Sequence, residues 1–354
     1  MAARETVADL NWNGDVLVKL AAIVAGGVLL TGFSELNVTG QGRDLNCRLQ
    51  IADCRWPDRS DRGLHAGLPP GPRSAIANRQ SAVPASVRVG VLQDGSYRVS
   101  TIPLEQYVAR VVAGEAALNS DPAALQALAI TVRTFALANR GRHHADGFDM
   151  CDETHCQVMR TATAATERAA RDTEGRVLLH NGRPASVYYS ASCGGRTEVP
   201  SAVWPGAVNP RFLPSRPDKA CRGEPAWTAD IPSADLERAL VAAGFRGGLR
   251  SIRVASRNES GRVARLTIEG FTPPDISGQD LRVAVGRTLG WRFIKSTAFD
   301  LTQSGSVYRF AGQGSGHGVG LCVIGATRLA ASGQRSTAIL NRYFPGLQIG
   351  RAKP

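Results

Sequence analysis

The sequence contains no nucleotide-binding P-loop, no zinc-finger spacing and no aromatic platform of the kind that binds RNA. Its arginines are spread along the chain and form no basic cluster. The 42 Lys and Arg residues outnumber the 30 Asp and Glu residues, which gives a net charge of +12. This charge favours a polyanionic neighbour, for which nucleic acid, anionic lipid and cell-wall polymer all qualify. Because nucleic-acid motifs are missing, we expect no nucleic-acid partner.

The chain also lacks an apolar run of the ~20 residues that cross a bilayer comfortably. Segment 16–33 has one lysine and then a short apolar stretch ending in small residues, which is typical of a signal-peptide core. A buried helix of the folded domain is the alternative. We expect residues 1–35 to be a signal peptide or a membrane anchor. The protein would then be exported to the periplasmic or cell-wall side of the cytoplasmic membrane and would contact the membrane only there.

The seven cysteines fit an exported protein, because an oxidising compartment permits disulfides. Their odd number leaves at least one thiol that is unpaired or bound to a metal. Cys47 and Cys54 lie close together in sequence and precede the main domain, so a local disulfide between them is expected.

The pattern of the chain predicts three parts. Segment 56–84 is rich in Pro, Gly, Arg and Ser without an apolar period, so residues 36–85 are expected to be a cysteine-containing segment and linker. Residues 86–350 should form the main domain, with a smaller second lobe over about 225–310. Hairpins, as at 86–100 and 252–269, alternate with helices, as at 104–118 and 121–141, and this favours an α+β fold of two lobes around a cleft.

Glu115 is the first candidate for chemistry. It follows Val111 by one turn on the apolar face of the helix that also carries Tyr107, Val108 and Val112. A carboxyl group placed against apolar neighbours loses the hydration of its charged form, so its pKa should rise toward the range of a general acid. The alternative is an ordinary glutamate at a helix end.

Arg133 lies beside the buried stripe of the next helix and needs an anion. It could pair with Glu115 or bind a carboxylate or carbonyl of a substrate, because guanidinium is always charged and offers a fork of donors. A surface arginine with a packed stem is the alternative.

Four segments together resemble the SpoIID/LytB family over roughly residues 86–345. They are the helical run 104–139, CDETHCQV from Cys151, YYSASCGGRTE from Tyr188 and GSGHGVGLC from Gly314. The resemblance implies a peptidoglycan lytic transglycosylase in which Glu115 is the catalytic acid and Arg133 matches the arginine of the family's second helix. Such an enzyme cleaves glycan strands, leaves 1,6-anhydro-muramic acid ends and needs no cofactor for its chemistry. The LytB side of the family implies the alternative, a non-catalytic peptidoglycan-binding enhancer of a cell-wall amidase.

A loop rich in cysteine and histidine has the ligand types and tight spacing of a structural zinc site. The expected ligands are Cys151, His155, Cys156 and His144, with His143 as the substitute for His144. A disulfide between Cys151 and Cys156 is the alternative that an oxidising compartment favours. A catalytic zinc centre is a third interpretation, but four ligands from one loop would leave no position for water.

The two glycine-containing segments are the expected substrate-binding loops. Glycine lets a backbone approach a ligand closely, although glycine pairs also occur in plain tight turns. The candidate binding residues are Tyr189, Ser190, Ser192, Gly194, Gly195, Thr197 and His317. A disulfide between Cys193 and Cys221 would tie the first loop to the segment after it. A Cys322 nucleophile with His317 as its base is a weaker alternative, because apolar surroundings raise the pKa of a thiol.

Overall fold

The computed structural model describes residues 86–93, 95–153 and 156–351. The expected signal or anchor segment, the linker and the Cys47–Cys54 pair lie outside these residues. Within the described ranges, no helix has the length and apolar character needed to cross a membrane.

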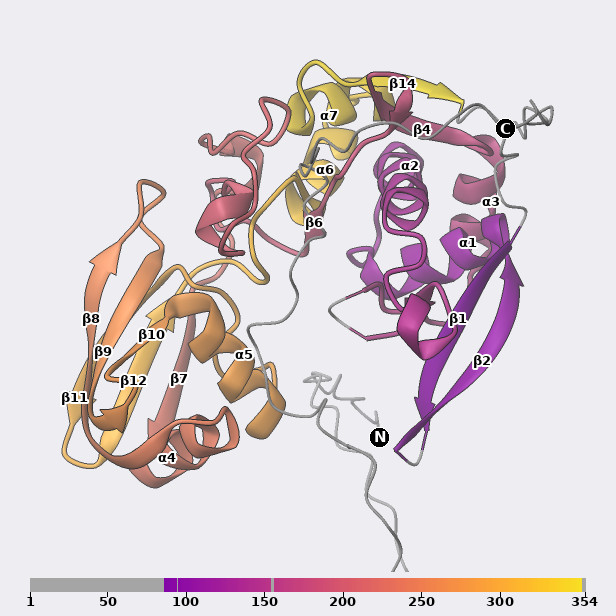
Figure 1. Ribbon diagram of the computed structural model, residues 1–354. Helices are drawn as coiled ribbons and strands as arrows, with labels where there is room; N and C mark the ends of the chain where they lie inside the picture. Colours follow the sequence, from indigo (N-terminus) through magenta and orange to yellow (C-terminus); the bar gives the residue numbers. More distant parts are fainter. Residues whose placement is uncertain (1–85, 94, 154–155, 352–354) are drawn as a thin grey trace, which may run out of the picture. The chain divides into compact units, whose positions relative to one another are not determined.

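Helices and small sheets alternate along the chain, which confirms the predicted α+β class (Figure 1). The α-helices are α1 (Leu104–Glu115), α2 (Pro122–Ala138), α3 (Ala164–Asp172), α4 (Ser233–Ala242), α5 (Gly278–Thr288), α6 (Val323–Ala331) and α7 (Ser336–Tyr343). The strands are β1 (Ser86–Gln93), β2 (Ser96–Pro103), β3 (Met150–Cys151), β4 (Arg176–His180), β5 (Arg183–Pro184), β6 (Tyr189–Ser190), β7 (Trp227–Pro232), β8 (Arg246–Arg257), β9 (Val263–Thr272), β10 (Asp275–Ser277), β11 (Phe299–Ser304), β12 (Val307–Gly312), β13 (Leu321–Cys322) and β14 (Gln348–Arg351).

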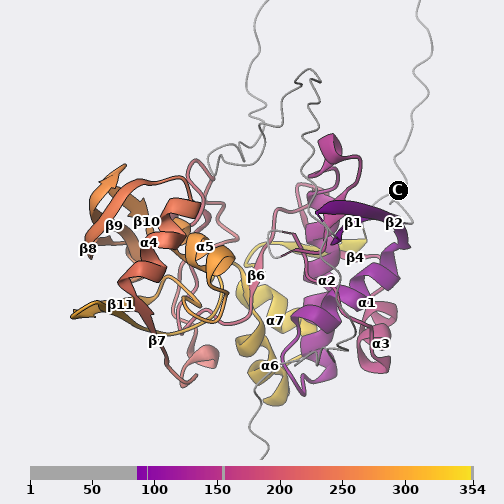
Figure 2. The same ribbon diagram turned by 90° about the horizontal axis from the view of Figure 1, so that it is seen from below.

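Helix α2 is the centre of the first hydrophobic core. It contacts α1, α3, α6, α7 and strand β4, which surround it in both views (Figures 1 and 2). All its residues from Ala127 to Ala136 are buried. Such burial requires a helix that is apolar on every side, and this segment meets the requirement with Arg133 as its one charged residue.

The predicted hairpin at the start of the domain is confirmed. Strands β1 and β2 pair antiparallel from Ser86↔Pro103 to Gln93↔Ser96, and β3 adds to β1 in parallel. Strand β2 ends at Pro103, and α1 begins at the next residue with its apolar face on the core.

A second hydrophobic core lies between residues 227 and 310. It contains one sheet in the order β11-β12-β7 and another in the order β10-β9-β8, with α4 and α5 packed against them and each other (Figure 1). The hairpin predicted at 252–269 is confirmed as β8–β9, with its turn at 258–262.

The second core is inserted into the first. Strand β6, before the insertion, pairs in parallel with β13, after it, and β4 pairs with β14 near the end of the chain. Only Tyr189–Ser190 of the first glycine-containing segment forms a strand, β6, and its partner is β13. That partner is too distant along the chain for a local pattern to reveal.

The predicted cleft between two lobes stays a prediction. A groove of about 550 Å³ beside α1 and α3 is lined by residues that include Glu105 and Arg110 but not Glu115.

Candidate functional site

Glu115 is the last residue of α1, and its side chain is half-buried. The helix was predicted to continue to residue 118, but the backbone becomes extended at Ala116. The Glu115 Oε1 accepts a hydrogen bond of 3.0 Å from the backbone N–H of Val158. Burial raises the pKa of the carboxyl group, and this hydrogen bond opposes the rise in part. Glu115 therefore keeps its proton to a higher pH than an ordinary glutamate, as a general acid requires.

Gly114 allows the backbone at Val158 to reach Glu115. A Cβ atom at Gly114 would lie 2.4 Å from the Val158 carbonyl oxygen, which is closer than Cβ contacts in proteins come. The same backbone segment has a second contact with α1, because the N–H of Arg160 donates to the carbonyl of Arg110 at 3.0 Å. The end of α1 and segment 158–160 thus form one unit.

Gln157 joins two tyrosines beside this unit. It is fully buried, its Oε1 accepts from the Tyr107 hydroxyl at 2.9 Å, and its Nε2 donates to the Tyr189 oxygen at 3.2 Å. Burial is the main reason that the pKa values of both tyrosines are raised well above the ordinary value, and the nearby charge of Glu115 adds to it. Gln157 lies in the CDETHCQV segment. Its role could not be predicted from the sequence, because its partners Tyr107 and Tyr189 are distant along the chain.

Arg133 does not pair with Glu115, which was one of the partners considered for it. Arg133 is fully buried, and its guanidinium forms a two-pronged ion pair with Glu105, with Nε to Oε1 at 2.9 Å. It also donates to the carbonyl groups of Ala170 and Arg176, at 3.1 and 3.0 Å. These partners belong to α1, to α3 and to the start of β4, so Arg133 holds three elements around α2. Its position makes it a structural residue behind the site.

The cysteine and histidine loop brings together three of the expected metal ligands. The ligand atoms of His143, Cys151 and Cys156 lie within 4.8 Å of one another, and His143 Nε2 is 3.4 Å from the Cys156 sulfur. The structure selects His143 in place of His144, which is exposed. The other ring nitrogen of His143 is 2.7 Å from an Asp146 oxygen, as is common for histidine ligands of metals. His155 lies outside the described residues.

The hydroxyl groups predicted to bind substrate differ in their burial and hydrogen bonding. Ser192 and Thr197 are buried and bonded inside the protein, Thr197 to the carbonyl of Pro214 at 2.8 Å, so neither presents its hydroxyl to a ligand. Tyr189 is half-buried at the site. The Ser190 hydroxyl is buried and has no hydrogen-bond partner among the described residues.

The glycines of the two loops serve the contact between the loops themselves. A Cβ atom at Gly194 would lie 3.2 to 3.3 Å from the backbone of Gln313 and Gly314, whereas Gly195 has a positive φ of 94°. Ser192 and Ser315 form an antiparallel bridge, with N–H to carbonyl distances of 3.0 and 2.8 Å. The close approach that the sequence suggested for a ligand is made here by a second loop.

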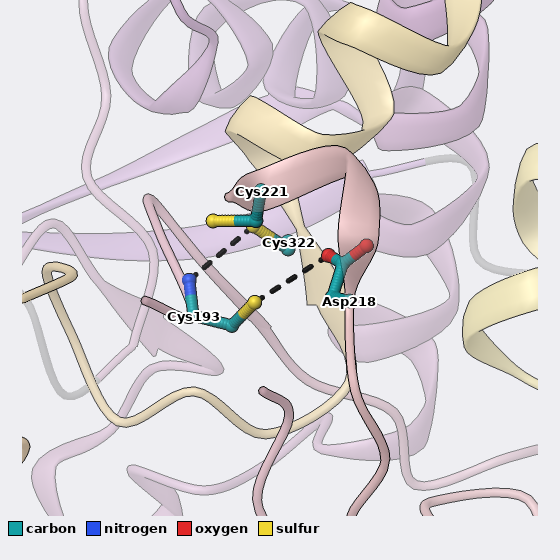
Figure 3. A group of neighbouring side chains, drawn as sticks. All are labelled: Cys193, Asp218, Cys221 and Cys322. Carbon is teal, nitrogen blue, oxygen red and sulfur yellow. Dashed lines mark hydrogen bonds between the residues drawn. The ribbon is translucent and has the colours of Figure 1, made fainter. Parts of the chain in front are cut away.

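The predicted Cys193–Cys221 disulfide is absent from the structure. Both residues are thiols that form no disulfide. Cys193 and Cys221 instead meet Cys322 and Asp218 in one buried cluster (Figure 3). Cys322 is therefore no nucleophile exposed to a substrate: it is 0% exposed.

His317 lies in the second loop as an uncharged ring. Burial is the main cause that lowers its pKa to about 3, and the charges of Arg282 and Arg262 add to this. Its Nδ1 accepts a hydrogen bond of 3.0 Å from the N–H of Val319, so the proton of the neutral ring is on Nε2. His317 can donate or accept a hydrogen bond at neutral pH but cannot supply a positive charge.

Three half-buried rings form an aromatic trio of Tyr188, Trp204 and His317. The ring centroids are 4.6 Å apart for Tyr188 and Trp204, 5.0 Å for Trp204 and His317, and 6.2 Å for Tyr188 and His317. Trp204 was not predicted, since it lies outside both glycine-containing motifs and no local pattern distinguishes it.

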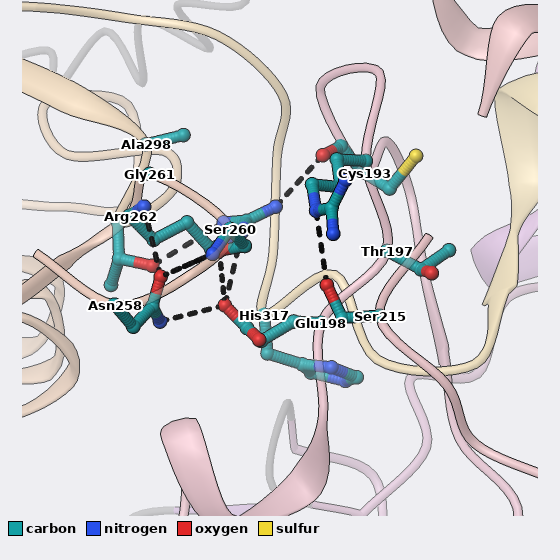
Figure 4. Close-up of polar contacts among 12 residues, drawn as sticks. Cys193, Thr197, Glu198, Ser215, Asn258, Ser260, Gly261, Arg262, Ala298 and His317 are labelled. Carbon is teal, nitrogen blue, oxygen red and sulfur yellow. Dashed lines mark hydrogen bonds and ion pairs between the residues drawn. The ribbon is translucent and has the colours of Figure 1, made fainter. Parts of the chain in front are cut away.

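A buried ion pair connects the first glycine-containing loop, which carries Cys193, to the inserted core (Figure 4). Glu198 and Arg262 are each 2% exposed and 4.0 Å apart. Glu198 also accepts from Asn258 at 2.7 Å and Ser260 at 2.5 Å, and Arg262 donates to the Cys193 carbonyl at 2.8 Å. The turn between β8 and β9 is thereby fixed to the loop that carries Cys193.

Together these features define an α+β protein in which a half-buried carboxyl group with a raised pKa, that of Glu115, lies at the end of a helix. Comparison with known proteins places it more closely. Residues 93–180 match the family model described as stage II sporulation protein, and residues 226–320 match a domain of unknown function. This family match supports the resemblance to the SpoIID/LytB family that the sequence indicated.

Individual relatives agree with this assignment. Stage II sporulation protein D of Bacillus amyloliquefaciens is 25% identical, with 84% of this chain and 90% of the relative covered. The protein of the same name from Bacillus subtilis (strain 168) is 26% identical, with 79% and 83% covered. The amidase enhancer of Bacillus subtilis (strain 168) is 25% identical over 64% of this chain and 38% of that protein.

Proposed function

We propose that this protein is a peptidoglycan lytic transglycosylase in which Glu115 is the only acid and base. The observation that carries the proposal is the environment of Glu115: a half-buried carboxyl group with a raised pKa, fixed by the Val158 N–H at 3.0 Å. The family match and the relatives named stage II sporulation protein D support it. They also favour a role in cell-wall processing outside the cytoplasm, which fits the export predicted from segment 16–33.

The reaction needs one carboxyl group. The protonated Glu115 gives its proton to the glycosidic oxygen while the bond from that oxygen to C1 of the muramic acid breaks. The resulting carboxylate takes the proton of the C6 hydroxyl, and O6 bonds to C1 to close the 1,6-anhydro ring. Glu115 ends protonated as it began. A hydrolase with two carboxylates would need a second acid placed several ångströms away.

The neighbours of Glu115 suit this cycle. Val158 can donate to the carboxylate after the first proton transfer, which limits how far burial raises the pKa. Tyr107 and Tyr189 keep their protons because their pKa values are raised, so they add no negative charge. The aromatic trio offers ring faces with polar tips, which fit the amphipathic surface of a sugar.

Arg133 takes a positioning role in this proposal. Its ion pair with Glu105 fixes α1, and α1 in turn places Glu115. The loop with His143, Cys151 and Cys156 supplies three thiolate or imidazole ligands of the kind that structural zinc prefers. A zinc ion bound there would fix segment 151–156, which leads directly into Gln157 and Val158.

The test is product analysis by mass spectrometry after incubation of purified protein with purified peptidoglycan. We expect fragments with 1,6-anhydro-muramic acid ends from the wild type and from Glu167→Gln, which changes an exposed helix glutamate. Glu115→Gln should bind glycan and retain its fold but release no such fragments. Cutting by Glu115→Gln, or reducing ends in place of anhydro ends, would remove this mechanism.

The enhancer of a cell-wall amidase is the second candidate. The relative named amidase enhancer favours it. In this case the protein alone would release nothing from peptidoglycan. Addition of a cell-wall amidase would then give faster release of stem peptides than the amidase alone, and Glu115→Gln would enhance as well as the wild type.

A further inference from the structure

Cys193, Asp218, Cys221 and Cys322 meet in the interior of the first core, from three segments that are distant along the chain (Figure 3). None of them is more than 2% exposed. Their ligand atoms, three sulfurs and one carboxylate oxygen, all lie within 4.8 Å of one another. This set is separate from the loop of His143, and the acid/base mechanism does not use it.

We propose that these four residues bind a structural zinc ion. Zinc prefers four tetrahedral ligands with thiolate sulfur at about 2.3 Å, which puts neighbouring sulfurs about 3.8 Å apart. A group of ligand atoms within 4.8 Å closes around such an ion with small side-chain shifts. Four protein ligands leave no position for water, so the ion would have a structural role.

The hydrogen bonds around the sulfurs are those of thiolate ligands. The Cys322 sulfur accepts from the backbone N–H of Cys193 at 3.3 Å and from that of Gly325 at 3.4 Å. Gly325 lies in the first turn of α6, whose N-terminal dipole favours negative charge. Cys221 lies 3.2 Å from the Ser192 hydroxyl. Donors that point at sulfur stabilise the charge that a metal ligand carries.

Both oxygens of Asp218 are held in place. Oδ2 accepts from the Tyr343 hydroxyl at 2.8 Å, and Oδ1 accepts from the N–H of Ala220 at 3.2 Å and lies 3.5 Å from Arg342. The Cys193 thiol donates to Oδ2 at 3.4 Å, the bond that a zinc ion would replace. Burying a carboxylate costs desolvation free energy, and a zinc ion at Asp218 would add to the compensation that Arg342 gives.

The charge of the site is compensated. Three thiolates and one carboxylate around Zn²⁺ carry a net charge of −2, and the buried Arg262 and the half-exposed Arg342 lie next to them.

A disulfide explains the cluster less well. It would join two of the three sulfurs and leave the third as a buried thiol beside the Asp218 carboxylate. The hydrogen bonds from the backbone N–H groups of Cys193 and Gly325 to the Cys322 sulfur would also be weaker, because a disulfide sulfur is a weak acceptor.

Zinc here would fix both glycine-containing loops. Cys193 precedes Gly194-Gly195, and Cys322 follows the loop that carries His317. The bridge between Ser192 and Ser315 already joins these loops. A tetrahedral ion would make their junction rigid and so hold the aromatic trio in place.

The test uses the full chain, purified without chelator or reductant, in a background in which serine replaces every other cysteine. The substitutions are Cys47→Ser, Cys54→Ser, Cys151→Ser and Cys156→Ser. Plasma mass spectrometry should find one zinc per chain. Exchange for Co²⁺ should give a sulfur-to-cobalt charge-transfer band and the intense visible bands of a tetrahedral site. Asp218→Asn should shift these bands, and Cys322→Ser should lose the metal.

A folded background protein that binds no zinc or cobalt would overturn the proposal. A second measurement covers the case in which the background does not fold. In the wild type, the triple change Cys193→Ser, Cys221→Ser and Cys322→Ser should lower the zinc content by one ion per chain, whereas Cys151→Ser should not affect this ion. Unchanged zinc in the triple variant, or a Cys193–Cys221 disulfide found by peptide mapping of metal-free wild type, would contradict it.

Discussion

The carbonyl oxygen of Val158 lies against Gly114, and the N–H of the same residue donates to Glu115. One peptide segment thus contacts two successive residues at the end of α1. The position of the carboxyl group depends on this contact, because α1 ends at Glu115 and no further helical turn supports it.

Gly114→Ala should reduce activity without unfolding the protein. The new Cβ would lie 2.4 Å from the carbonyl oxygen of Val158, so Val158 must move away. A shift of about 1 Å at a reacting group can lower the rate roughly 100-fold. Release of anhydro-muropeptides is the measurement. Gly248→Ala is the control, since its Cβ would meet no atom closer than 3.8 Å. Equal rates for both variants would show that the contact does not position Glu115.

Glu115→Gln should change the pH dependence of stability. Burial raises the pKa of Glu115 in the folded state above the ordinary glutamate value, so folding favours the protonated form. This contribution is fully present below the ordinary value and is lost as pH rises through the native pKa. The Glu115→Gln variant has no such loss. As pH rises from the ordinary glutamate pKa through the native pKa, the melting temperature of the variant should therefore increasingly exceed that of the wild type. Parallel curves for the two proteins would contradict the raised pKa.

His317 should have the opposite effect. Its pKa is lowered to about 3 by burial, so the folded state favours the neutral ring. Its contribution to stability is present above the unfolded value of about 6.5 and is lost as pH falls from there toward 3. Unfolding by denaturant at several pH values should show a steeper acid loss for the wild type than for His317→Gln. NMR should find no titration of the His317 ring between pH 7 and 4; a ring that titrates near 6.5 would disprove this.

Glu105→Gln should destabilise the protein much more than an exposed ion-pair partner does. Arg133 is 0% exposed, and loss of one partner of a buried pair costs about 3 kcal/mol because a charge is left uncompensated. Urea unfolding measures the difference. Glu167→Gln, which breaks the exposed pair with Arg171, should cost under about 1 kcal/mol. Similar losses for the two variants would mean that Arg133 finds other anions.

Local patterns were sufficient for the elements of the chain that depend on near neighbours. The hairpins β1–β2 and β8–β9 and helices α1 to α6 follow from alternation, apolar periods and turn residues, and the apolar face of α1 gave the burial of Glu115. The partner of Arg133 did not follow. A stripe on α2 shows one buried face, whereas six elements surround this helix and bury its other faces too.

Choices between adjacent residues and contacts between distant ones were also beyond the sequence. His143 and His144 have nearly the same spacing to Cys151, and only the turn of the backbone decides that His143 faces the sulfurs. Trp204 and His317 come from segments that no period connects. The same is true of Cys193 and Cys322, which were assigned to different roles and lie in one cluster.

The insertion of the second core has a consequence for the order of folding. Cys193 and Cys322 are 129 residues apart, and closing so long a loop costs conformational entropy. Strands β7 and β12 pair from Trp227↔Gly312 to Pro232↔Val307, so the inserted core brings its own two ends together once it has formed. We expect the insertion to fold first as the chain is made, which reduces the long loop to two short arms. The first core can then close last, when α6, α7 and β14 arrive.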